Sequence, residues 1–255
     1  MRAELARSVA ALLPPGGWVE HEDGTEPVLW LSAGPVGAGL WESVLAEHPR
    51  SELWPLLLDG ESREGQHMWE RGEFHPGRAS RPDLYDPGLL LARWWTERLA
   101  EDGPEPIAPF GVRWPGLVPG GPPAADPARA AAGCARDVVS RRSHVRLGLV
   151  AAESGAEALA LLGWDGVAEQ DDDLGTYAAV LASWEDRFGA RLVAVDGSEL
   201  VLSVAAPPSD EAQALRIAAE HYAFCPDGIR YGPTDTLAGY APTLIDSGTW
   251  RFCWD

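Results

Sequence analysis

The sequence of 255 residues contains no lysine, so its 20 basic residues are all arginines, and they face 39 acidic residues. Without a lysine amine the chain lacks the side chain for Schiff-base or pyridoxal phosphate chemistry, for a Walker A loop and for a kinase nucleotide site. The formal net charge of −19 at pH 7 disfavours nucleic acid as a partner, because such binding depends on neutralising phosphates. The composition therefore indicates no cofactor, and its charge favours a basic protein as partner.

Cysteines and long apolar runs are also scarce. The three cysteines, Cys134, Cys225 and Cys253, are an odd number without a disulfide framework, so we expect reduced thiols. The longest apolar runs, such as 56–58 and 89–91, are far too short to span a bilayer, and no signal-peptide pattern follows Met1. We therefore expect a cytoplasmic protein without a membrane partner.

Proline and glycine are concentrated between residues 101 and 125, where they disfavour both helix and central strand. This composition predicts a linker or a long surface crossing, followed by an alanine-rich helix that Asp126 caps. We therefore divide the chain into an N-terminal α/β region, a linker with its helix, and a C-terminal α+β domain. Their boundaries are 1–100, 101–140 and 141–255.

The C-terminal region has the clearest periodicity. Apolar residues recur every three or four positions over 173–188, which predicts an amphipathic helix. Asp196-Gly197 predicts a hairpin between two strands, and Pro242 predicts a kink or break in a helix over 236–245. Without the short helices 156–162 and 236–245, the order of elements is strand, helix, strand, strand, helix, strand. This order is typical of a ferredoxin-like split βαβ sandwich, so we expect an α+β fold of that kind. The expected elements are strand 144–151, helix 173–188, strands 191–195 and 199–205, helix 209–225 and strand 249–254.

The N-terminal region gives a weaker pattern. It predicts strands over 28–32 and 53–58, a helix over 40–47, and a helix that begins at Asp86-Pro87. Because proline cannot donate to a sheet ladder, Pro55 predicts an edge position for the second strand.

Five segments of the C-terminal half resemble a bacterial family called domain of unknown function 4253, which is common in actinobacteria. The resemblance covers mainly residues 145–255, and Cys253 departs from it because the family often has an aromatic residue there. It implies no activity and no catalytic residue. The segments are ALALLGWDG (158–166), WEDRFGARLV (184–193), LVLSVAAPP (200–208), AAEHYAFCPD (218–227) and WRFCWD (250–255).

One cluster of reactive residue types, Glu220, His221, Cys225 and Asp227, falls at the end of the helix predicted over 209–225. His221 and Cys225 are four positions apart, a spacing that suits zinc or a thiolate beside a histidine. Cys253 is the candidate for a third metal ligand. The structural alternative is that Cys225 is a core residue, as cysteines often are, and we prefer it to either the catalytic or the metal-binding alternative.

Tryptophan is unusually frequent, with 12 residues in the chain. Trp69 and Trp114 lie in segments that are predicted to be loops, so we take them as candidate anchors for a binding partner. Burial of these rings by folded-back loops is the alternative, and the large area of a tryptophan ring favours it. The stretch 59–76 around Trp69 also holds His67 and His75 among several acids, but it matches no compact metal motif, and a solvated loop explains it better.

Two hypotheses for the function follow. The first is a non-enzymatic protein-binding factor, immunity-like or regulatory, that engages a basic protein through its acidic surface. The alternative is an enzyme, metal-dependent if His221 and Cys225 bind zinc, that uses the cluster from Glu220 to Asp227.

Overall fold

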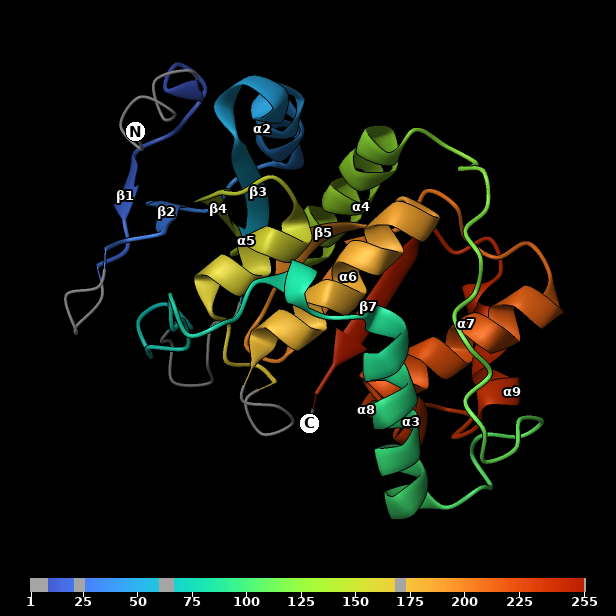
Figure 1. Cartoon of the computed structure of the whole chain (residues 1–255). Coiled ribbons are helices and arrows are strands. Elements are labelled where there is room, and N and C mark those ends of the chain that lie inside the picture. The colour runs from blue at the N-terminus through green and yellow to red at the C-terminus, as the bar shows by residue number, and fades with distance from the viewer. Residues whose placement is uncertain (1–8, 21–25, 60–66, 168–172, 255) are drawn as a thin grey trace.

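The computed structural model describes residues 9–20, 26–59, 67–167 and 173–254. Within these residues the centre is one sheet of seven strands in the spatial order β1-β2-β4-β3-β5-β6-β7 (Figure 1). Adjacent strands are antiparallel except for β3 and β5, which run parallel. The strands are β1 (Gly16–Trp18), β2 (Leu29–Ser32), β3 (Leu53–Leu58), β4 (Arg146–Ala151), β5 (Arg191–Val195), β6 (Glu199–Ser203) and β7 (Thr249–Cys253).

Helices cover both faces of this sheet. The hydrophobic side chains of α2 and α4 pack on one face, while those of α3, α5, α6 and α7 belong to a larger core on the other. The helices are α2 (Ala38–Ser51), α3 (Pro87–Asp102), α4 (Pro127–Arg141), α5 (Gly155–Leu162), α6 (Leu174–Phe188), α7 (Glu211–Phe224), α8 (Asp227–Arg230) and α9 (Leu237–Tyr240), with the 3-10 turns η1 (Pro82–Leu84) and η2 (Ala241–Leu244).

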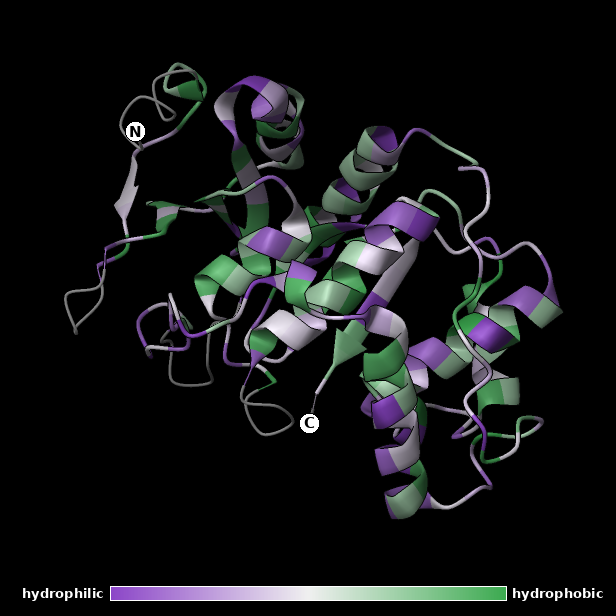
Figure 2. Ribbon diagram, in the orientation of Figure 1, coloured by the Kyte–Doolittle hydropathy of each residue, from purple (hydrophilic) through white to green (hydrophobic). Residues whose placement is uncertain are grey.

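The alternation of side chains along β3 shows how one strand serves both cores. Leu53 and Leu57 pack with α2 and α4, whereas Trp54, Leu56 and Leu58 belong to the opposite core. Successive side chains of a strand point to opposite faces, so a strand buried on both sides needs apolar residues at every position. In Figure 2, by contrast, α3 carries both hydrophobic and hydrophilic bands, as a helix with one buried face should.

Several predicted helix ends are confirmed. The side chain of Asp126 caps α4, and that of Asp173 caps α6. Gly189 ends α6 in the left-handed conformation at φ 58°, which glycine adopts at little cost. Around Pro242 the predicted break is present, because α9 ends at Tyr240 and the chain continues as η2.

The expectation of an α+β fold is confirmed, but a ferredoxin-like split is not established. β5, β6 and β7 are neighbours in chain order, and β3 from the first hundred residues lies between β4 and β5. Strands from both sides of the linker therefore share one sheet.

The predicted edge position of Pro55 is wrong, because β3 lies inside the sheet. β3 pairs with β4 along its whole length but with β5 only at Leu57 and Leu58. The carbonyl of Pro55 instead accepts a hydrogen bond from Trp41 Nε1 at 3.1 Å. Proline is tolerated here because this part of the strand has no ladder partner on the side of β5.

The segment rich in proline and glycine, residues 103–125, is called the Pro/Gly crossing below. It packs against α6 and α7 at Val118 and then reaches the segment just after β6, where the amide of Ala124 donates to the Ala205 carbonyl at 2.8 Å. In the part of the chain that the structure describes, none of the helices combines the length and apolar character needed to cross a bilayer.

Candidate functional site

The sequence-predicted cluster of Glu220, His221, Cys225 and Asp227 lies at the end of α7 and the start of α8, and all four residues are buried. Glu220 is fully buried and faces α6 and the Pro/Gly crossing. Its carboxylate accepts two hydrogen bonds from Arg187, at 2.8 and 2.7 Å. It also accepts one from Trp184 Nε1 at 2.8 Å and one from the Val118 amide at 2.8 Å. With its charge paired and four donors satisfied, Glu220 acts as a structural link.

His221 and Cys225 engage different partners. Nδ1 of His221 lies 3.1 Å from the Tyr240 hydroxyl, and burial lowers the pKa of His221 to about 3, so its imidazole is neutral. The Cys225 thiol donates to the carbonyl of Cys253 at 3.1 Å, and burial raises its pKa well above the usual range. A thiol held protonated in this way is a poor nucleophile and a poor metal ligand.

Asp227 is the first residue of α8, and its carboxylate pairs with Arg230 at 3.6 Å. Cys253 is exposed on β7, with its sulfur 3.8 Å from the Ser198 hydroxyl. Among the described residues, no three or more His, Cys, Asp or Glu side chains are grouped so as to hold a metal ion. The alternative ligands His221, Cys225 and Cys253 are thus not brought into one such group.

Both candidate tryptophan anchors are half-buried. Trp69 stacks on His67 at 4.4 Å between ring centroids, and the guanidinium of Arg146 lies 5.0 Å from its ring. Trp69 also borders a hollow of about 250 Å³, together with Glu20 and Glu70. Trp114 lies in the Pro/Gly crossing.

Trp114 packs against Trp95 of α3, at 5.5 Å between ring centroids. This contact places one face of Trp114 against the core, so the ring serves packing at least in part. Of the polar stretch 59–76, residues 60–66 lie outside the described residues.

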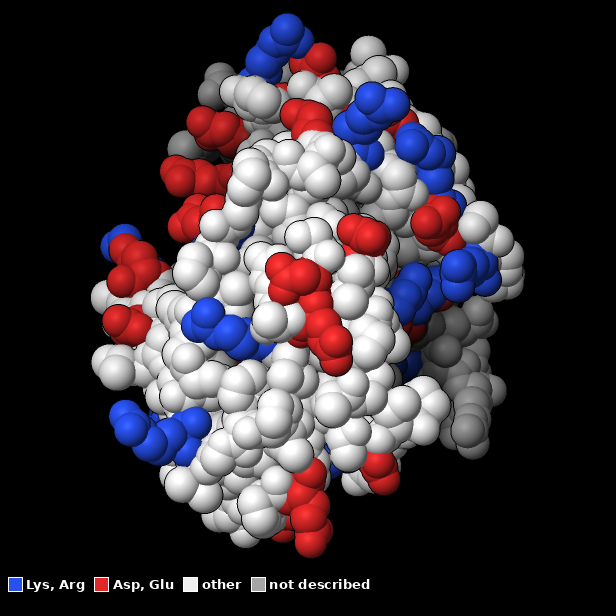
Figure 3. All heavy atoms as spheres, turned by 90° about the vertical axis from the view of Figure 1, so that its right-hand side faces the viewer, with Lys and Arg blue, Asp and Glu red and all other residues white. Residues whose placement is uncertain are grey.

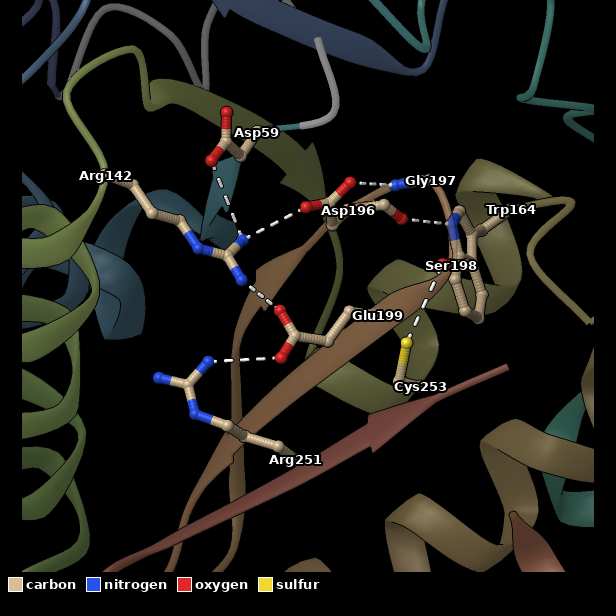
Figure 4. Close-up of polar contacts among 9 residues, drawn as sticks. All are labelled: Asp59, Arg142, Trp164, Asp196, Gly197, Ser198, Glu199, Arg251 and Cys253. Carbon is tan, nitrogen blue, oxygen red and sulfur yellow. Dashed lines mark hydrogen bonds and ion pairs between the residues drawn. The ribbon is translucent and has the colours of Figure 1, made fainter. Parts of the chain in front are cut away.

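A network of ion pairs joins residues at the ends of β3, β5 and β6 to Arg142 and to Arg251 in the middle of β7 (Figure 4). Arg142 precedes β4 and pairs with three carboxylates. Glu199 also pairs with Arg251 of β7 at 3.2 Å. Burial raises the pKa of Asp196 above its usual range. Because these carboxylates are already paired with two arginines, the network links strands and is not an open site. We call it the ion-pair clasp. The partners of Arg142 are Asp59 at 3.7 Å, Asp196 at 3.2 Å and Glu199.

A groove of about 700 Å³ lies between η1, the start of α5 and the outer face of α6. Its apolar lining comes from three alanines, Ala156, Ala179 and Ala182. Because alanine side chains are small, the groove has room for another side chain. Five carboxylates and two arginines complete the walls. Both arginines are already paired, Arg81 with Asp83 at 2.5 Å and Arg187 with Glu220. The five acids are Asp83, Glu153, Glu157, Glu185 and Asp186.

The acids of this groove differ in how much of their charge is available. Glu185 pairs with Arg191 at 2.8 Å, and burial raises its pKa. Glu157 accepts a hydrogen bond at 2.6 Å from the amide of Glu153, the residue before the Ser154 cap of α5. The carboxylates of Glu153 and Asp186 have no side-chain partner among the described residues. They stand at the ends of two helices and are available to a cation.

Sequence reasoning missed this groove, because its acids come from three separate segments. One signal was present. Ala179, Ala182, Ser183 and Asp186 recur at helical spacing opposite the apolar stripe of α6, which marks a face of small residues with an acid at its end. Nothing in the sequence shows that η1 approaches that face.

The surface charge does not form one patch on the face that carries α7 and α9. Figure 3 shows acids and arginines there as separate spots among uncharged residues. Net charge by itself therefore does not mark a binding surface, whereas the groove combines charge with shape.

These observations define an α+β protein with a central mixed sheet, a closed ion-pair clasp and an open acidic groove. Residues 146–255 match the family described as Domain of unknown function (DUF4253), so this segment of the chain is a DUF4253 domain. Comparison with curated proteins and with solved structures gave no significant match. The matched segment begins at β4, so it includes α5 and α6 of the groove but not η1.

Proposed function

We propose that the protein is a non-enzymatic protein-binding factor, immunity-like or regulatory, whose groove between η1, α5 and α6 receives a basic segment of a partner protein. The observation that carries this proposal is that the carboxylates of Glu153 and Asp186 have no side-chain partner in the described part of the chain, in a groove whose two arginines are already paired with acids. An arginine or lysine side chain suits this environment, because its aliphatic stem can lie along the alanines while its charged end reaches a carboxylate.

The enzyme alternative has weaker support from the geometry. The charge of Glu220 is paired with Arg187, and the buried Cys225 thiol donates to a carbonyl. Asp227 pairs with Arg230, and His221 contacts Tyr240 through Nδ1, although its buried Nε2 has no hydrogen-bond partner among the described residues. Most groups of that cluster thus have a structural partner, whereas two carboxylates of the groove have none in the described part of the chain.

The experiment is a titration of the full chain with a labelled 12-residue peptide of arginine and serine at physiological ionic strength. The variant Glu153→Gln/Asp186→Asn should weaken binding about five- to tenfold, since each exposed ion pair contributes up to about 1 kcal/mol. Binding should also weaken as salt is added.

A matched control variant distinguishes an effect of the groove on binding from an effect of the overall net charge. Asp137→Asn/Glu211→Gln removes the same charge from exposed positions on α4 and α7. It should leave the affinity within about twofold, because a charge far from the site acts mainly through the screened field. Equal losses in the two variants would show that the peptide binds to overall charge, and the proposal would be wrong.

A further inference from the structure

Two exposed leucines lie next in the chain to residues that line the groove, Leu84 at the end of η1 and Leu89 in the first turn of α3. Leu84 is 68% exposed and Leu89 is 73% exposed. Leu84 stands between the lining residues Asp83 and Tyr85, and Leu89 follows the lining residue Pro87 by two positions. A single exposed leucine is common on protein surfaces, but two of them near an acidic groove form a candidate contact surface.

The segment that carries these leucines is held in place, so their exposure is not the result of a loose loop. The Tyr85 hydroxyl donates to Asp173 at 2.6 Å, and the same carboxylate accepts from the Ser80 amide at 2.9 Å. Asp86 then caps α3 by accepting from the amides of Gly88 and Leu89 at 2.8 and 3.0 Å. A rim fixed by these bonds loses little freedom when a partner binds to it.

Resting on the function proposed above, we propose that the partner segment is amphipathic, with arginine or lysine side chains that enter the groove and neighbouring leucine-like side chains that pack on Leu84 and Leu89. Charge complementarity selects the basic residues, through Glu153 and Asp186. The two exposed leucines favour apolar residues next to those basic residues in the partner, because covering an exposed leucine removes apolar area from water. A free polyamine could use the acids but would leave the leucines uncovered.

The test compares two 12-residue peptides that carry the same arginines. In one the remaining positions are serine, and in the other two of those serines are leucine. The leucine-containing peptide should bind the full chain about tenfold more tightly, which corresponds to partial burial of one or two leucines. That advantage should disappear in Leu84→Ser/Leu89→Ser.

Val112→Ser serves as the control, because Val112 is 72% exposed and lies in the Pro/Gly crossing, outside the groove lining. This variant should retain the tenfold advantage. If both peptides bind the parent chain equally and Glu153→Gln/Asp186→Asn weakens both, the apolar rim plays no part and only this inference is overturned. If neither peptide binds, the proposed function itself is wrong.

Two further outcomes would identify a different occupant. Spermine that binds as tightly as the leucine-containing peptide, with the same dependence on Glu153 and Asp186, would make a small polyamine the ligand. If the parent chain sediments as a dimer and Leu84→Ser/Leu89→Ser as a monomer, the leucines are covered by a second copy of this chain. Either result would overturn the inference.

Discussion

At the scale of single residues, the carboxylate of Glu220 joins three parts of the chain that are distant in sequence. It binds α6 through Arg187 and Trp184, and the Pro/Gly crossing through the amide of Val118. The residue types around it suggest catalysis when they are taken from the sequence alone. The contacts show instead a buried acid whose charge is neutralised by a residue 33 positions away.

Replacing Glu220 by alanine should destabilise the fold by about 3–5 kcal/mol, because it leaves the Arg187 charge without its buried partner. Urea unfolding measures this change. Glu47→Ala is the control, since Glu47 pairs with Arg50 on the surface and such a pair contributes at most about 1 kcal/mol. A loss below about 1 kcal/mol for Glu220→Ala would contradict the structural role given to this carboxylate.

At the scale of elements, the Pro/Gly crossing is more than a flexible connection. Val118 is buried, and its carbonyl accepts a hydrogen bond from Arg187 at 2.8 Å. Gly120 lies so close to α6 that an added Cβ would be 2.4 Å from the Arg187 carbonyl oxygen. The composition of this segment predicted the absence of helix and strand, but composition does not show what such a segment packs against.

Gly120→Ala should therefore separate the crossing from α6 and destabilise the protein by about 1–3 kcal/mol, the usual effect of overpacking. The measurements are urea unfolding and the rate of proteolysis within residues 103–125. Gly121→Ala is a neighbouring control, because an added Cβ there has no atom of the described residues within 4 Å. Its effect should stay within about 0.5 kcal/mol. Similar effects of the two substitutions would mean that the close approach of Gly120 to α6 does not matter.

At the scale of the whole molecule, the sheet joins the regions that composition separates. The strand neighbours of β4 are β2 and β3, and both precede the matched DUF4253 segment. Among the described residues of 146–255, β4 consequently has no strand to pair with, while β5, β6 and β7 still pair with one another.

Residues 146–255 expressed alone should therefore fail to fold as they do in the full chain. An unpaired β4 would expose backbone donors and acceptors together with the apolar side chains of both its faces. We expect poor dispersion of amide signals in NMR spectra and no cooperative thermal transition, in contrast to the full chain. A fragment that melts cooperatively, with the β4 amides protected from exchange, would show that β4 finds another partner within the segment, and this prediction would be wrong.

The elements that could be predicted are those with strong local signals. α6 has apolar residues at helical spacing between the Asp173 cap and Gly189, and the β5–β6 hairpin follows from Asp196-Gly197. β3 was predicted as a strand, but its place was wrong, because the tolerance of Pro55 depends on how far β5 extends beside it. For the site, the acidic composition predicted a basic partner. No pattern in the sequence indicates that one groove brings together Asp83, Glu153 and Asp186.

The sequence by itself determined the secondary structure of the C-terminal region, the α+β class and the absence of lysine chemistry, because these depend on composition or on neighbours within one or two turns. Only the tertiary structure decided that β3 enters between β4 and β5, that Glu220 is neutralised by Arg187, and that η1 closes a groove against α6. Those features depend on contacts between distant residues, whose free energy comes from burial and pairing that no local pattern encodes.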